Sequence, residues 1–69
     1  MSNPGDRRFA GMTINERLIT AGLLNEWDRA AFARDLAQMI AVLQQVELTA
    51  AEAASVAASV LEDPAKYGF

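Results

Sequence analysis

The amino-acid sequence predicts an all-α fold, a small bundle of about four short helices with a central antiparallel helical hairpin. Three observations lead to this prediction. Large apolar residues recur at helical spacing between residues 36 and 46. A Thr-x-x-Glu signature, which marks the start of a helix, occurs at Thr13 and again at Thr49. Alanine, the residue with the highest helix propensity, accounts for 14 of the 69 residues.

A capping box at Thr13 predicts a first helix over residues 14–21, and Gly22 then suits the left-handed backbone that ends a helix. Residues 1–8 show no helical period, and we expect them to form a disordered N-terminal tail. The remaining residues, 9–69, are expected to form a single helical domain.

A second helix is expected over residues 23–34, with Trp27 on its apolar face. Phe32 departs from this face, so it marks either an edge of the core or a contact surface. Residues 33–35 contain neither glycine nor proline, and two interpretations stay open there, a tight turn or one continuous helix. The apolar stripe changes phase near Phe32 and Asp35 is a competent cap, which favours the turn and therefore a helical hairpin.

The central helix is expected over residues 36–46. Its apolar residues follow one another at steps of three, one, three and three, which places on one stripe Leu36, Met39, Ile40, Leu43 and Val46. Asp35 precedes this stripe, where its carboxylate can accept hydrogen bonds from the free amides of the first turn. We therefore expect this helix to form the centre of a small core.

The last helix is expected over residues 50–62, after the second capping box. Its polar residues lie on one narrow side, and the rest of its circumference is an apolar arc wider than one neighbouring helix requires. Either several helices of this chain cover the arc, or a second copy or another protein contacts it. The small size of the chain favours association. The candidate partner-contact residues are Phe32, Ala50, Ala54, Ala58 and Leu61.

The C-terminal residues end this helix and return toward the bundle. Asp63 precedes Pro64, and a residue before proline avoids helical backbone. The same pair can also begin one extra turn, with proline at its first position. Two aromatic residues follow, and we expect Tyr67 or Phe69 to dock on the helices.

The composition excludes several kinds of site. The chain has no cysteine and no histidine, so it lacks disulfides, thiolate metal ligands and the commonest general base. Its glycines are isolated, and its carboxylates are too sparse to bind a metal ion through oxygen alone. We therefore expect no catalytic residue, no cofactor and no metal, and we do not expect an enzyme.

The net charge of −3 is distributed unevenly, with +1 on residues 1–34 and −4 on residues 35–69. An acidic half disfavours nucleic-acid binding, because affinity for phosphates comes from clustered Lys and Arg. No apolar run approaches the roughly 20 residues that span a bilayer, so no membrane contact is expected. The N-terminus lacks the pattern of a secretory signal, and the cytoplasm is the expected location.

Four short motifs occur together in this chain. They are Asn-Glu-Arg-Leu at residues 15–18, Ala-Gly-Leu-Leu at 21–24, an aromatic–Asp pair at 27–28, and Asp-Pro-x-x-Tyr-Gly-Phe at 63–69. In this order they resemble a group of short, uncharacterised bacterial helical proteins. The resemblance spans about residues 9–69 and implies a compact helical fold. It implies no activity, ligand or site.

Two functions are compatible with these observations. The preferred hypothesis is a small protein–protein interaction module, acting as a homodimer or as a small subunit or regulator of a larger complex. Its acidic half would suit a basic partner. The alternative is a nucleic-acid-associated regulator with helix-turn-helix-like helices, although a basic recognition helix is missing from the sequence.

Overall fold

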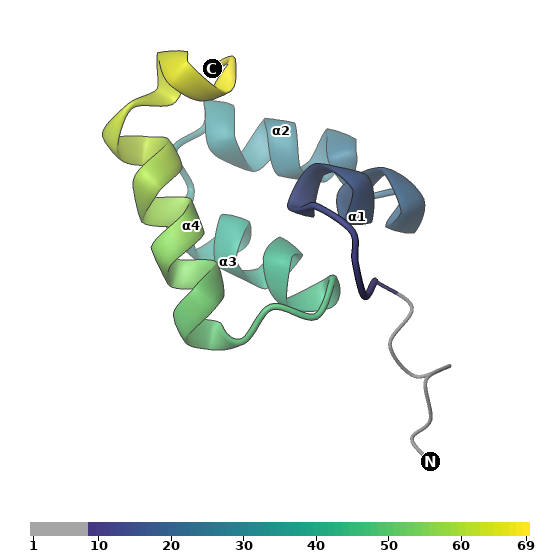
Figure 1. The fold of residues 1–69 in the computed structure, drawn as a ribbon. Coiled ribbons are helices and arrows are strands. Elements are labelled where there is room, and N and C mark those ends of the chain that lie inside the picture. Colours follow the sequence, from purple (N-terminus) through teal and green to yellow (C-terminus); the bar gives the residue numbers. More distant parts are fainter. Residues whose placement is uncertain (1–8) are drawn as a thin grey trace.

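The computed structural model describes residues 9–69, and over this range it contains helices and turns and no strand (Figure 1). Its α-helices are α1 (Ile14–Ala21), α2 (Leu24–Phe32), α3 (Leu36–Gln45) and α4 (Ala50–Glu62), and a 3-10 helix, η2 (Pro64–Tyr67), follows them. These helices pack against one another, which confirms the predicted all-α bundle. The tail predicted at residues 1–8 lies outside the described residues.

Helix α3 lies in the middle of the bundle and packs against both α2 and α4. Its pairing with α2 forms the predicted hairpin, and α1 packs against α2 (Figure 1). Helices α1 and α4 therefore stand on opposite flanks of the molecule, with the hairpin between them.

The starts of α1 and α4 form as the sequence predicts. Thr13 Oγ1 accepts the Glu16 amide at 3.1 Å, and the Glu16 carboxylate accepts the Thr13 amide at 2.8 Å. Thr49 and Glu52 repeat this reciprocal pair at α4, with distances of 3.1 and 2.9 Å. Both capping boxes satisfy amides that have no partner within the helix.

The connection between α2 and α3 is a tight turn, and the alternative of one continuous helix is wrong. Arg34 adopts a φ of 58°, in the left-handed region, and its guanidinium donates to the Ala31 carbonyl at 2.8 Å. The Asp35 amide donates to the Ala30 carbonyl at 2.9 Å. The Asp35 carboxylate accepts the Gln38 amide at 3.1 Å, so it caps α3 as predicted.

Helices α1 and α3 end with the same backbone pattern. After α1, Gly22 has a φ of 74°, and the next amide reaches back to the Leu18 carbonyl at 2.8 Å. After α3, Glu47 has a φ of 75°, and the next amide reaches the Leu43 carbonyl at 3.3 Å. This is the Schellman motif, whose left-handed position usually holds glycine. Glu47 therefore adopts a conformation that residues with a Cβ rarely accept.

The core is built around α3. In α3 and its C-terminal cap, the residues that are 0% exposed are Met39, Val42, Leu43 and Val46. The predicted stripe is wrong at Leu36, which is 44% exposed, and it omitted Val42. The reason is that α3 is covered by two helices at once, so its buried arc is wider than one stripe and is turned toward Val42. Leu36 lies in the first turn, at the edge of that arc.

The aromatic residues divide between the core and its edge. Trp27 is 7% exposed and belongs to the core, as predicted. The Phe69 ring meets the Phe32 ring edge-to-face, with centroids 5.1 Å apart, so a C-terminal aromatic residue does dock on the bundle. Phe32 itself stays 62% exposed. Pro64 begins η2, which is the extra turn that the sequence allowed.

Replacing Met39 with alanine should lower the free energy of unfolding by about 2–5 kcal/mol, because a fully buried side chain is lost and a cavity remains. Leu36→Ala, in the same helix at a position 44% exposed, should cost less than about 1 kcal/mol. Urea denaturation followed by circular dichroism measures both values. Equal losses would contradict the surface position of Leu36.

Candidate functional site

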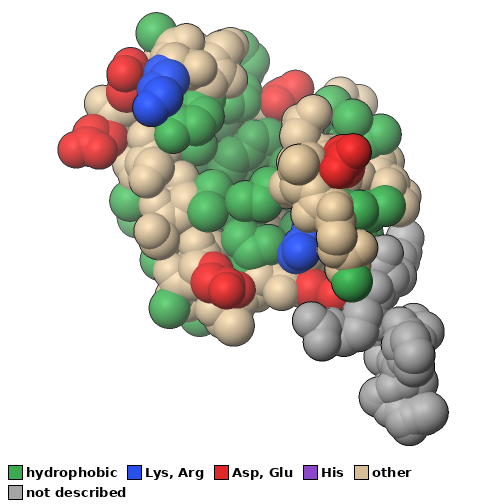
Figure 2. Space-filling view, in the orientation of Figure 1, with side chains coloured by type: hydrophobic (Ala, Val, Ile, Leu, Met, Phe, Trp, Pro, Cys, Tyr) green, Lys and Arg blue, Asp and Glu red, His purple; other side chains and the backbone are tan. Residues whose placement is uncertain are grey.

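An apolar groove runs between α1 and α4. In the space-filling view, hydrophobic side chains cover the floor of a hollow between these helices, and charged side chains lie around it (Figure 2). Two adjoining cavities form the groove, and Ile14 of α1 lines both of them. We call this surface the α1–α4 groove, and we call its two parts the upper and the lower cavity.

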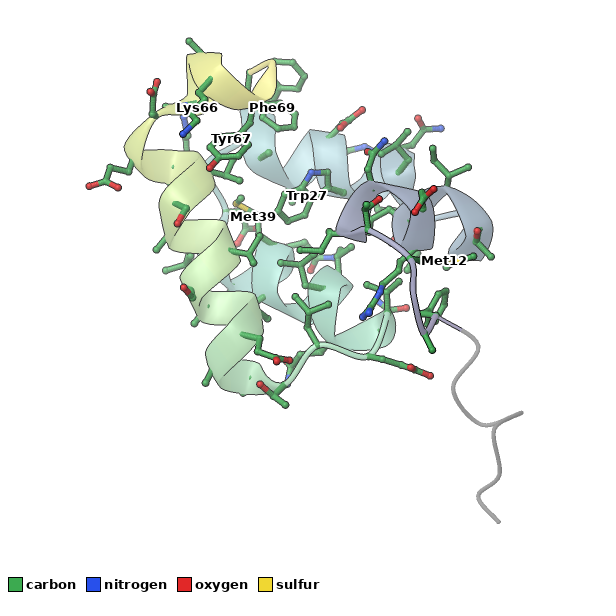
Figure 3. The ribbon with its side chains drawn as sticks, in the orientation of Figure 1. Met12, Trp27, Met39, Lys66, Tyr67 and Phe69 are labelled. Carbon is green, nitrogen blue, oxygen red and sulfur yellow. The ribbon has the colours of Figure 1, made fainter. Side chains whose placement is uncertain are left out.

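The upper cavity, of about 240 Å³, lies at the end of the groove next to η2. It is lined by Ile14, Asn15, Leu18, Trp27, Asp28, Val60, Tyr67 and Phe69. Trp27 extends from α2 into the space between α1 and α4, and Tyr67 lies above it on η2 (Figure 3). Three of the five aromatic residues of the chain therefore border this cavity.

The lower cavity, of about 640 Å³, lies where α1 and α4 begin. It is lined by Met12, Thr13, Ile14, Arg17, Glu47, Leu48, Thr49, Glu52 and Val56. The two capping threonines border it, and their reciprocal hydrogen bonds already satisfy amides at both helix starts. Val56 is half-buried and supplies the apolar wall on the α4 side.

Arg17 ties α1 to the rest of the bundle beside the lower cavity. One of its guanidinium nitrogens donates to the Val46 carbonyl at 3.0 Å, and its Nε donates to the Met12 carbonyl at 3.2 Å. Val46 directly follows α3, so this side chain links the first helix to the end of the third. The link holds α1 in place on a surface where α1 packs mainly against α2.

Carboxylates border both ends of the groove. Asp28 lines the upper cavity, and Glu47 and Glu52 line the lower one. Asp28 is half-buried and the two glutamates are exposed. Among the described lining residues, Arg17 is the single cation. The groove therefore combines an apolar floor with a rim of negative formal charge.

The partner-contact residues predicted from the sequence lie outside this groove. On one flank of α4 are Ala50, Ala54 and Ala58, which are exposed, and Leu61, which is half-buried. This flank is opposite to the one that carries Val56, because each residue advances about 100° around a helix. Phe32 belongs to the end of α2 and contacts Phe69. The role of these five residues as partner contacts stays a prediction.

Other hollows on the described surface are not apolar grooves of this kind. A hollow of about 440 Å³ beside the hairpin is lined by alanine and polar residues only. Over residues 9–69, no three acidic, histidine or cysteine side chains lie together in a way that would bind a metal ion. The helices of the same range are too short or too polar to cross a membrane. The α1–α4 groove is the feature from which a function can be argued.

Comparison with known proteins identifies no relative, since no protein-family model, curated protein or solved structure matches the chain. The resemblance to short bacterial helical proteins therefore stays a prediction. The function has to be inferred from the shape, polarity and charge of the groove.

The sequence contained only a partial signal for the groove. Ile14 and Leu18 share one face of α1, and that face alone predicts a helix packed on a core. In the structure Leu18 is 1% exposed, whereas Ile14 is half-buried because it lies where α1 leaves the core and borders the groove. The periodicity of a helix shows which of its faces is apolar but not how far it lies from another helix. The groove between α1 and α4 was therefore not predicted.

Arg17→Met should lower the free energy of unfolding by about 1–3 kcal/mol, because it keeps much of the aliphatic chain and removes charged donors to two backbone carbonyls. Arg29→Met, at an exposed position of α2, should change it by less than about 0.5 kcal/mol. Thermal and urea denaturation test the pair. Similar stabilities for the two variants would show that Arg17 does not hold α1 to the bundle.

Proposed function

We propose that this protein is a small protein-interaction module that binds an amphipathic helix of a partner protein in the α1–α4 groove. The observation that carries the proposal is the apolar floor left open between two helices on opposite flanks of the bundle (Figure 2). In this mode of recognition, a helix places apolar residues roughly three or four positions apart into a hydrophobic groove.

The polarity of the groove supports a protein ligand over a small molecule. Small-molecule sites place a few polar groups inside an apolar pocket, where they orient the ligand. Over residues 9–69, no polar or charged side chain is buried. The upper cavity is instead floored by buried apolar residues, among them Leu18, Trp27 and Val60. Such a floor can bind apolar side chains of a partner, and polar contacts with the partner would form at the rim of the groove.

Charge favours a partner protein over a second copy of this chain. Two copies that met groove to groove would bring Asp28, Glu47 and Glu52 of each close to the same residues of the other, and like charges across an interface are costly.

The nucleic-acid alternative gains no support from the described cations. Arg17 and Arg34 both donate to backbone carbonyls, whereas phosphate binding needs a cluster of free basic side chains. A cytoplasmic location stays a prediction.

A peptide-display selection tests the proposal. The probe is a library of helical peptides of about 15 residues, roughly four turns, with randomised residues on one face. Wild-type protein should enrich peptides with apolar residues at helical spacing. Val56→Gln, which places a polar side chain on the groove wall, should weaken the selected peptides about tenfold or more. Ala58→Gln, an exposed position on the opposite flank of α4, is the matched control and should bind as wild type does.

Two outcomes would contradict the proposal. Loss of peptide binding in Ala58→Gln with full binding in Val56→Gln would move the site to the alanine flank predicted from the sequence. A wild-type dimer that Val56→Gln converts to a monomer, measured by sedimentation equilibrium, would make a second copy the occupant of the groove. Circular dichroism of both variants verifies that they fold.

A further inference from the structure

The two ends of the α1–α4 groove repeat one chemical pattern, a carboxylate beside an apolar surface. At the upper end, Asp28 borders the same cavity as Trp27 and Tyr67. At the lower end, Glu47 and Glu52 border the same cavity as Val56. A ligand that filled the groove would therefore meet apolar side chains along its middle and negative charge at both ends.

Aromatic rings and one carboxylate together border the upper cavity. Aromatic rings attract Lys and Arg through their negatively charged faces, and a neighbouring carboxylate adds a full charge. One of these rings already interacts with a cation of the chain, since Lys66 Nζ lies 5.8 Å from the centroid of the Tyr67 ring. Trp27 and Asp28, both on α2, line this cavity together, so it is bordered by an indole and a carboxylate.

Arg17 is the one cation among the described lining residues of the groove, and Lys66 lies beside the Tyr67 ring of the upper cavity. Arg17 lines the lower cavity, but two of its nitrogens donate to the Val46 and Met12 carbonyls. Glu52 accepts the Thr49 amide through one oxygen, which leaves its negative charge at the mouth of the groove. A partner with basic residues would supply the missing positive charge.

We propose, as an extension of the function proposed above, that the helix bound by the α1–α4 groove is cationic, with a lysine or arginine at each end of its apolar face. The basic residue at one end enters the upper cavity, against the Trp27 and Tyr67 rings and the Asp28 carboxylate. The basic residue at the other end pairs with Glu47 and Glu52. The apolar residues between them cover the floor.

Two matched peptide libraries test this inference. Both randomise the same apolar face, and the positions flanking that face are fixed as Lys in one library and as Glu in the other. The Lys-flanked library should yield the tighter binders, by about tenfold in Kd, and their affinity should fall as salt is added. Emission from Trp27, the single tryptophan, should change on binding, because this residue lines the upper cavity.

Charge-neutralised variants identify the acids involved. The double variant Glu47→Gln/Glu52→Gln should weaken Lys-flanked peptides about three- to tenfold, and Asp28→Asn should weaken them by a similar factor. Glutamine still satisfies the capping box at position 52. The control is Glu26→Gln/Asp35→Asn, which removes the same formal charge from the hollow beside the hairpin and keeps a competent cap at position 35. This control should bind as wild type does.

The failures of the two proposals are distinguishable. If Glu-flanked peptides bind as tightly as Lys-flanked ones and still depend on Val56, the groove stands and the cationic partner is wrong. If the control double variant weakens binding as much as Glu47→Gln/Glu52→Gln does, net charge accounts for the preference and the assignment to the groove acids is wrong. If neither library yields peptides that Val56→Gln weakens, the function proposed above fails and this inference fails with it.

Discussion

The packing of α3 between α2 and α4 determines the rest of the structure. Four residues of α3 and its C-terminal end are completely buried, so α2 and α4 must both lie against this one helix. Helix α1 is joined to α2 by a short turn and packs on it, which places α1 across the hairpin from α4. The gap between α1 and α4 is thus a result of how the core is built. Its floor is the outer surface of that core, and it is apolar for the same reason that the core is.

A short chain has few ways to keep such a gap open. Closing α1 onto α4 would bury more apolar surface, which is favourable in a domain of 69 residues. Directional hydrogen bonds to the backbone nevertheless fix α1 and the starts of both helices. Arg17 donates to the Met12 carbonyl, just before α1, and to the Val46 carbonyl, just after α3, and the capping boxes fix where α1 and α4 begin. The position of α1 therefore depends on hydrogen bonds to the backbone as well as on apolar burial.

The helices were predictable from the sequence because their signals are local. Thr13, Asp35 and Thr49 each cap the helix that they were expected to cap, and Gly22 ends α1 as expected. The errors arise where the outcome depends on neighbours. Leu36 continues the stripe of α3 in sequence, yet it is exposed because α3 is covered by two helices whose directions the stripe does not encode. The groove was not predicted for a similar reason. Its walls come from α1, α4 and η2, and the distance between these elements depends on contacts between residues far apart in the sequence.

Glu47 combines a left-handed backbone conformation with a place on the rim of the groove. Its φ of 75° is one that glycine adopts without strain, and its carboxylate stands at the mouth of the lower cavity. Glycine here would relax the chain reversal after α3 and would also remove a negative charge from the rim. Backbone geometry alone thus favours glycine at this position, whereas the negative charge of the rim comes from glutamate. On the function proposed above, glutamate at this position would supply the acidic entrance of the groove at the cost of a strained chain reversal.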